Sequence, residues 1–551
     1  MKVMFSREIQ FTPISLTPKA GWLETARQSI KLPCAFAMGA VLGFATPGFD
    51  QDYLAWFALA PLLVLIRGCQ NGLQATLTGF VFGAGYFAIA LSFFTGLSPL
   101  RWMQIPDILG YQLVFLAWAL ETCHLSLLFA AFALMVYHLP TRPGFLPHFR
   151  RPFYPYLIVV PAIWVFLMWV VSPSPLFFGI PLCQLAYTQS RNLPLIQVAA
   201  LGGSAAVDFL LVMVNAALAA VVIEATPLVR GMGARTDQFN TKAGMAIDLA
   251  LSLACISLIV GWGQFRISHL AEAVRPEKAM RVTPESPPVP IAIVQGNVSI
   301  EEERFKTISE AEFKTRYQEL STAQGAALLV LPEGVVTANQ DKPGADGLKE
   351  VLRAISANEK KEVIYGAVEP LKEGYANSAK LLSPFRLPGT TYIKQKLVPF
   401  GESIPINLIY QKIPEDLREK IPASKERFLE DKQARLLTSG FGKVGVAICN
   451  EIVYPKLVSD EVRKGASLLV CLANLGWFHN SSLGKQFLAC ATLRAVENKR
   501  YLILATNTGI SSVIDPLGMV VSRSYALKRG ILLDTVQFIY SRTPYNRMRW
   551  L

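Results

Sequence analysis

"VGVAICNE", residues 444–451, is a run of apolar residues that leads directly into a cysteine, an asparagine and a glutamate. A short continuous apolar run is typical of a strand that is buried on both faces of a sheet. The cysteine that follows it has two interpretations. Free cysteine often packs as a small buried hydrophobe, but a cysteine at the end of a strand can also be a nucleophile. The rest of the chain decides between them.

Similar apolar runs recur through the second half of the chain, and segments with helical periodicity separate them. The other runs are "PIAIVQGN" (290–297), "ALLVLPE" (327–333), "EVIYGAV" (362–368), "SLLVCLAN" (467–474) and "YLILATNTG" (501–509). Helical patterns cover residues 308–323, 346–358 and 484–498. This alternation predicts an α/β domain of about 260 residues, which is enough for a substantial core.

The first half of the chain has a different composition. The whole chain is 52% hydrophobic and only 17% charged, whereas soluble proteins are nearer a quarter charged. A membrane span needs about 20 mostly apolar residues. The sequence predicts a membrane domain over residues 30–265 with seven spans, at 30–47, 52–67, 72–97, 109–138, 154–172, 203–223 and 244–264.

Basic residues between the spans predict the orientation, because cytoplasmic loops are enriched in lysine and arginine. Arg101 and Arg191 fall on one side, and the other side carries Lys2, Arg7, Lys19, Arg27, Lys31, Arg67, Arg142, Arg150, Arg151, Arg230, Arg235 and Lys242. Residues 1–29 are therefore expected in the cytoplasm, with no cleaved signal peptide. After the proline-rich linker 266–289, residues 290–530 are expected in the periplasm, so we predict a multi-pass protein of the bacterial inner membrane. The net charge of +13 fits this topology, and no nucleic-acid-binding pattern is present.

Three ionisable residues, Glu121, His124 and Asp208, fall within predicted spans. Such residues are candidates for function, since charge is costly in a bilayer. The alternative is that each is satisfied by partners inside the helix bundle.

Several strands of the second half end in residues that suit acyl transfer. Glu333 ends "LVLPE", Lys394 and Glu402 lie in "YIKQKLVPFGE" (392–402), and Cys449 and Glu451 close "VAICNE". A carboxylate can take the thiol proton and return it to a leaving group. An ammonium and the N–H after the nucleophile can stabilise an oxyanion. Alone, each residue has an ordinary alternative as a solvated glutamate or a lysine with its head in water. We expect no metal and no cofactor.

The motifs "LPE", "YIKQKLVPFGESIP" and "VAICNE" resemble the glutamate, lysine and cysteine motifs of the nitrilase superfamily, in the same order. "NLGWF" (474–478), "RAVENKR" (494–500) and "ATNTGISSVIDPLG" (505–518) extend the likeness. With several spans in front, the chain resembles the apolipoprotein N-acyltransferase family. The resemblance implies an α-helical multi-span membrane domain plus an α/β nitrilase-like domain, an α-β-β-α sandwich.

The resemblance also implies a two-step reaction. Cys449 would take an acyl chain from a phospholipid as a thioester, and the N-terminal amine of diacylglyceryl-cysteine in an apolipoprotein would then accept it. Glu333 would be the acid and base, and Lys394 the oxyanion stabiliser. Glu402 and Glu451 match acidic positions that support this triad.

Two aromatic residues, Trp477 and Phe478, are candidates for binding the lipid donor, and their alternative is ordinary core packing. The chain departs from the family pattern at Asn450, where an aromatic residue is common, and at Arg304 and Leu475. Residues 531–551 read as a tail too short in apolar residues for a further span.

Two other functions share these features. A membrane-tethered amidase would pass the acyl group to water through the same triad. A non-enzymatic membrane scaffold with a decayed nitrilase-like domain would need neither Glu333, Lys394 nor Cys449.

Overall fold

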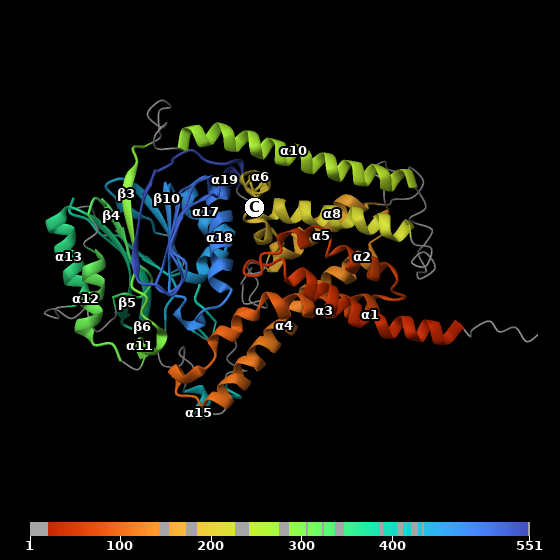
Figure 1. Ribbon diagram of the computed structural model, residues 1–551, viewed down its shortest axis with the longest axis horizontal. Coiled ribbons are helices and arrows are strands. Elements are labelled where there is room, and N and C mark those ends of the chain that lie inside the picture. Colours follow the sequence, from red (N-terminus) through yellow and green to blue (C-terminus); the bar gives the residue numbers. More distant parts are fainter. Residues whose placement is uncertain are drawn as a thin grey trace, which may run out of the picture.

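The computed structural model describes most of the chain. The described residues are 20–139, 141–142, 154–171, 184–225, 242–274, 286–304, 307–321, 324–336, 347–385, 390–399, 401–404, 411–413, 415–419, 428–431, 433 and 435–548. A helical half is followed by a half built around two sheets (Figure 1).

Each of the seven predicted spans contains helix in the structure. The main helices are α1 (Ala20–Gly43), α2 (Ala60–Arg67), α3 (Gly72–Ala90), α4 (Asp107–His138), α5 (Tyr156–Val171), α8 (Ser204–Ala225) and α10 (Lys242–Val274). Shorter elements between them are η1 (Asp52–Trp56), η2 (Ser92–Leu97), η3 (Leu100–Met103), the strand pair β1 (Thr141–Arg142) and β2 (Tyr154–Pro155), η5 (Leu185–Gln189), α6 (Leu193–Ile196) and α7 (Ala199–Gly202). Among the described residues, four helices (α3, α4, α8 and α10) are long and apolar enough to cross a membrane.

Two predicted segments differ in detail from what the structure contains. Residues 52–67 form η1 and the eight-residue α2 rather than one continuous helix, and eight residues span much less than a bilayer. The helix α10 continues to Val274, beyond the boundary expected at residue 265. Most of the proline-rich segment lies outside the described residues.

The polar residues of the membrane half have partners there. His124 Nδ1 lies 3.2 Å from a carboxylate oxygen of Glu121. Asp208, which is buried, accepts a 2.6 Å hydrogen bond from the N–H of Ala186. The Glu121–His124 contact fits the interpretation in which the groups are satisfied inside the bundle. Asp208 fits it only in part, because its second carboxylate oxygen is buried without a hydrogen-bond partner among the described residues.

The second half contains two six-stranded mixed sheets. The first has the order β14-β3-β4-β5-β6-β7 and the second β13-β12-β11-β10-β9-β8. The strands of the first are β14 (Gly530–Val536), β3 (Val289–Gln295), β4 (Leu328–Val330), β5 (Glu362–Leu371), β6 (Gly374–Leu382) and β7 (Thr391–Ile393). Those of the second are β13 (Val520–Arg523), β12 (Ser512–Ile514), β11 (Leu502–Thr506), β10 (Leu468–Ala473), β9 (Gly442–Ile448) and β8 (Leu437–Ser439). Parallel pairing runs through β3-β4-β5 and β9-β10-β11.

The two sheets pack face to face and helices cover their outer faces. Ile293 and Val330 of the first sheet share one buried cluster with Val446 and Val470 of the second. The helices α12 (Glu310–Ser321) and α13 (Leu348–Glu359) cover the first sheet. The helices α17 (Pro455–Arg463) and α18 (Leu483–Asn498) cover the second. This is the expected α-β-β-α sandwich.

The helix layer of α17 and α18 also faces the membrane half. Buried residues of these helices belong to the same apolar cluster as residues of α3, α5 and α8, and Figure 1 shows α18 between the second sheet and the N-terminal helices. Burial of apolar surface therefore joins the halves directly. One sheet of the sandwich is thereby brought next to the membrane domain.

The sandwich extends past residue 530, where the sequence placed the start of a tail. The strand β14 pairs antiparallel with β3 from Gly530 to Val536. After it, the described residues form the short helix α19 (Pro544–Arg547), which packs on α7, α17 and α18. The alternating burial of β14 identifies an edge strand, a pattern too polar for a membrane span.

Candidate active site

Cys449 lies at the turn between β9 and η8 (Cys449–Val453). Its φ of +53° lies in the left-handed region that residues with a side chain rarely adopt. Strained backbone of this kind costs about 1–3 kcal/mol and often marks a functional position. A sharp strand-to-helix turn presents a nucleophile at the end of a sheet. Cys449 is partly exposed, and its thiol interacts with the Glu333 carboxylate.

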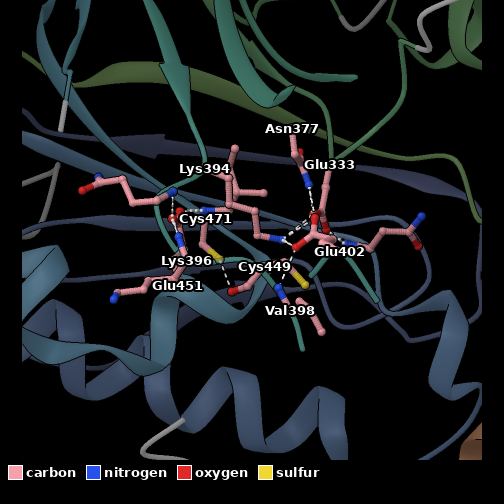
Figure 2. A network of polar contacts seen from close by, with 12 residues as sticks. Glu333, Asn377, Lys394, Lys396, Val398, Glu402, Cys449, Glu451 and Cys471 are labelled. Atoms are coloured by element: carbon pink, nitrogen blue, oxygen red, sulfur yellow. Dashed lines mark hydrogen bonds and ion pairs between the residues drawn. The ribbon is translucent and has the colours of Figure 1, made fainter. Parts of the chain in front are cut away.

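Glu333 and Lys394 come from the first sheet. Glu333 follows β4, and Lys394 follows β7 directly. Lys394 Nζ donates to Glu333 Oε1 at 3.2 Å and to Glu402 Oε1 at 3.0 Å. The three predicted catalytic side chains and Glu402 therefore lie together (Figure 2), although they are far apart in the sequence.

Asn377, on β6, holds the two carboxylates side by side. Its Nδ2 donates to Glu333 Oε1 at 2.8 Å and to Glu402 Oε1 at 2.7 Å. The backbone N–H of Asn474, just after β10, donates to the other Glu333 oxygen at 2.8 Å. Both Glu333 oxygens are thus fixed, while its side chain remains 11% exposed. Neither asparagine was predicted from the sequence as a site residue.

The charges of the cluster set its protonation. Burial alone would lower the pKa of Lys394, but the carboxylates of Glu333 and Glu402 outweigh it and hold that pKa well above its ordinary value. Burial and the same carboxylates raise the pKa of the Cys449 thiol well above its ordinary value, and Lys394 opposes them. Lys394 is therefore a cation, and Cys449 rests as a thiol. A thiol needs a base before it can react as a thiolate.

Glu451 connects the turn that begins at Cys449 to the segment that carries Lys394. Its carboxylate, which is fully buried, accepts hydrogen bonds from the N–H of Ile448 at 2.7 Å and of Gln395 at 2.6 Å. It also accepts from the Tyr392 hydroxyl at 2.7 Å. Burial raises its pKa to about 7, and these donors act in the opposite direction. Glu451 thus contacts both strand ends.

Asn450 is buried, and neither polar atom of its side-chain amide has a hydrogen-bond partner among the described residues. A buried amide without a partner is costly, which makes it a candidate for contact with a bound molecule. Its backbone N–H follows the nucleophile directly.

The aromatic pair of η9 (Gly476–Phe478) packs against the membrane half. Trp477 meets Trp102 edge to face with ring centroids 4.8 Å apart. Phe478 lies in a similar way 5.6 Å from Phe93. Both residues are half-buried. They line the junction of the two halves, three and four residues beyond Asn474.

The described side chains form no metal-binding cluster. They contain no group of three or more His, Cys, Asp and Glu residues placed to hold a metal ion. The cation among the carboxylates is the Lys394 ammonium.

Comparison with known families assigns both halves of the chain. Residues 38–217 match the family model described as the apolipoprotein N-acyltransferase N-terminal domain. Residues 290–543 match the carbon–nitrogen hydrolase model, which includes β14. An amidase from Nesterenkonia sp. is 19% identical, with a TM-score of 0.35 over 48% of this chain and 93% of that chain.

Relatives match over almost the whole chain. An apolipoprotein N-acyltransferase from Geobacter metallireducens is 30% identical over 516 residues, covering 92% of this chain and 89% of that protein. One from Synechocystis sp. is 27% identical, covering 87% and 89%. Because the likeness runs through both halves and includes the junction between them, this chain belongs to the apolipoprotein N-acyltransferase family.

Proposed function

We propose that this protein transfers a fatty acyl chain from a phospholipid, through a thioester on Cys449, to the N-terminal amine of diacylglyceryl-cysteine in apolipoproteins. One observation carries the proposal: a partly exposed cysteine thiol beside Glu333 and a buried lysine, in a chain of this family. Glu333, Lys394 and Cys449 are the proposed catalytic residues.

The first step would form the acyl-enzyme. Glu333 takes the Cys449 proton, and the sulfur attacks the ester carbonyl carbon of the phospholipid. The Lys394 ammonium and the N–H of Asn450 stabilise the oxyanion that results. When the C–O bond breaks, Glu333 returns the proton to the departing oxygen, and a lysophospholipid leaves.

The second step would discharge the thioester. The free amine of the acceptor attacks the thioester carbonyl, Glu333 accepts a proton from the nitrogen, and the C–S bond breaks. The Cys449 thiolate then regains that proton, and an amide has formed. The two substrates thus use one site in turn, in a ping-pong sequence.

The other predicted residues would support these steps. Glu402 shares Lys394 and Asn377 with Glu333, so it keeps the ammonium in place. Glu451 aligns the two strand ends. Trp477 and Phe478, at the junction with the membrane half, are proposed to contact the lipid donor.

The same proposal places the protein in the bacterial inner membrane with its sandwich in the periplasm. Its support is the asymmetry of basic residues between the predicted spans and the four long apolar helices. Both proposed substrates are lipids anchored in the periplasmic face of that membrane.

Peptide mass spectrometry after incubation with a phospholipid carrying a labelled acyl chain, without acceptor, tests the function. We expect the label on the Cys449 peptide, sensitive to hydroxylamine and absent from Cys449→Ala, and we expect a diacylglyceryl peptide to remove it. Folded protein that yields neither adduct nor lysophospholipid would contradict the proposal. An adduct that only water discharges would favour an amidase.

A further inference from the structure

A buried ion pair lies where the sandwich meets the membrane half. Arg494 and Glu497, one turn apart on α18, both have side chains with 0% exposure. Arg494 Nε lies 2.9 Å from Glu497 Oε2, and Arg494 Nη2 donates to Glu497 Oε1 at 3.0 Å. Neither residue takes part in the proposed reaction steps at Cys449. The reaction therefore does not explain why this ion pair is present.

Glu497 reaches out of the sandwich to the first turn of a membrane helix. Its Oε1 accepts a 2.7 Å hydrogen bond from the backbone N–H of Ser204, the first residue of α8. The first N–H groups of a helix lack partners within the helix, and the positive end of the helix dipole attracts a carboxylate. A side chain of the catalytic half therefore caps a helix of the membrane half.

The fit at this helix start is close. Gly203, just before the capped residue, has a φ of +70°, and a Cβ there would come within 2.7 Å of the Tyr545 ring. The 22-residue helix α8 then continues between the other membrane helices, where Asn215 accepts from the N–H groups of Leu59 and Ala60. Glu497 therefore connects the sandwich to α8, a helix that also makes hydrogen bonds to other segments of the membrane half.

A second path leads from the ion pair to the nucleophile turn. The Arg494 guanidinium lies over the ring of Tyr187, 5.9 Å from its centroid. The Tyr187 hydroxyl donates to the carbonyl of Val453 at 3.5 Å, and Val453 ends the turn that Cys449 begins. The residue before Tyr187 donates its N–H to Asp208, one turn along α8.

We propose that Glu497, whose charge Arg494 balances, is a positioning residue that locks the sandwich onto the start of α8 and so sets the Cys449 turn at a fixed height relative to the membrane. The inference rests on the proposed function, because it concerns how an ester in a bilayer reaches the thiol. A soluble ester needs no such alignment. The cap should therefore matter for membrane lipids and not for soluble esters.

Two double variants isolate the cap from the charges. Arg494→Met/Glu497→Gln removes both charges but keeps an amide oxygen to accept from Ser204, whereas Arg494→Met/Glu497→Leu removes the acceptor as well. Neither leaves an unpaired buried charge, which is the usual reason for collapse when one partner is removed. Ser204→Pro deletes the donor from the opposite side, and proline is tolerated in the first turn of a helix.

The readout is the rate of Cys449 acylation by two donors: phospholipid in bilayer vesicles and the water-soluble ester p-nitrophenyl butyrate. We expect the Leu variant and Ser204→Pro to lose about tenfold with vesicles and to stay within about twofold with the soluble ester, given the usual strength of a cap. The Gln variant should keep both rates.

Three outcomes overturn the inference: equal losses with both donors, unchanged rates with vesicles in the Leu variant and Ser204→Pro, or a Gln variant as impaired as the Leu variant. A wild-type protein that accepts the soluble ester but no phospholipid would instead contradict the proposed function. The behaviour of the wild type therefore separates the two failures.

Discussion

Two buried charge clusters among the described residues differ in charge balance and in exposure to water. Around Lys394, one ammonium faces two carboxylates whose side chains keep 11% and 13% of their surface exposed. At the junction of the halves, one guanidinium faces one carboxylate and neither has any exposed surface. In the first cluster a second carboxylate and partial access leave room for a proton to move. In the second cluster, the two charges balance and neither side chain is exposed to water. Such a pair is suited to holding neighbouring elements in one fixed arrangement.

Replacing Glu333 by Gln should have the largest effect on activity. Loss of the general base and acid should slow acylation of Cys449 by about 10²–10⁴-fold. The same change removes a negative charge that raises the pKa of the thiol, so more thiolate should exist at a given pH. We therefore expect iodoacetamide to alkylate Cys449 faster while acylation fails, as followed by mass spectrometry. Slower alkylation would show that Glu333 does not raise the thiol pKa.

Replacing Arg494 alone by Met should have the largest effect on stability. It leaves the Glu497 carboxylate buried without its partner, which typically costs about 3–5 kcal/mol of unfolding free energy. Denaturant unfolding in detergent would measure the loss. Arg494→Met/Glu497→Gln is the control and should recover most of it. If the double variant is as unstable as the single one, the pair is not a charge-balanced unit.

Replacing Asn377 by Ala should have an intermediate effect. Two carboxylates lose a shared hydrogen bond, and bonds to charged groups are each worth about 1.5–3 kcal/mol. We expect acylation to slow by about one to two orders of magnitude. The neighbour Ser378 bonds the carbonyl of Ala367 instead, so Ser378→Ala should leave the acylation rate nearly unchanged. If Asn377→Ala and Ser378→Ala slowed acylation equally, Asn377 would have no specific role in the site.

Replacing Asp50 by Asn should have the smallest effect. Asp50 pairs with Lys485 across the same junction at 3.0 Å, but the Lys485 and Asp50 side chains keep 50% and 32% of their surface exposed. Exposed pairs contribute about 0–1 kcal/mol and weaken with salt. Thermal unfolding at low and high salt should show little change. A loss as large as that of Arg494→Met would mean that burial is not what separates the two kinds of ion pair.

Sequence patterns were informative where a reactive or ionisable residue directly follows a buried strand. Glu333 and Cys449 end buried strands, so parallel pairing alone predicts that their strand ends point to one edge of each sheet. The membrane helices followed from composition. The edge strand β14 did not, because its alternating pattern is short and looks like a polar tail.

The contacts around Glu333, Lys394 and Cys449 could not be predicted from the sequence. Asn377 lies inside an ordinary strand, "YANSAKL", and only the pairing of β6 with β5 and β7 brings it to the carboxylates. Asn474 acts through its backbone N–H, which every residue but proline possesses. The motif "RAVENKR" contains Glu497. The residues around it in the sequence give no sign that its carboxylate contacts the start of a helix nearly three hundred residues earlier.

The pairing of β14 with β3 has a consequence for biosynthesis. These are the last and first strands of the sandwich, so β3 has an open edge until the end of the chain arrives. Contacts between such distant segments form slowly because a long loop must close first, and an open edge invites pairing with other chains. The segments bearing Glu333, Lys394 and Cys449 are thus made before their framework can close. A newly made chain would therefore bring Glu333, Lys394 and Cys449 together only as one of the last events of its maturation.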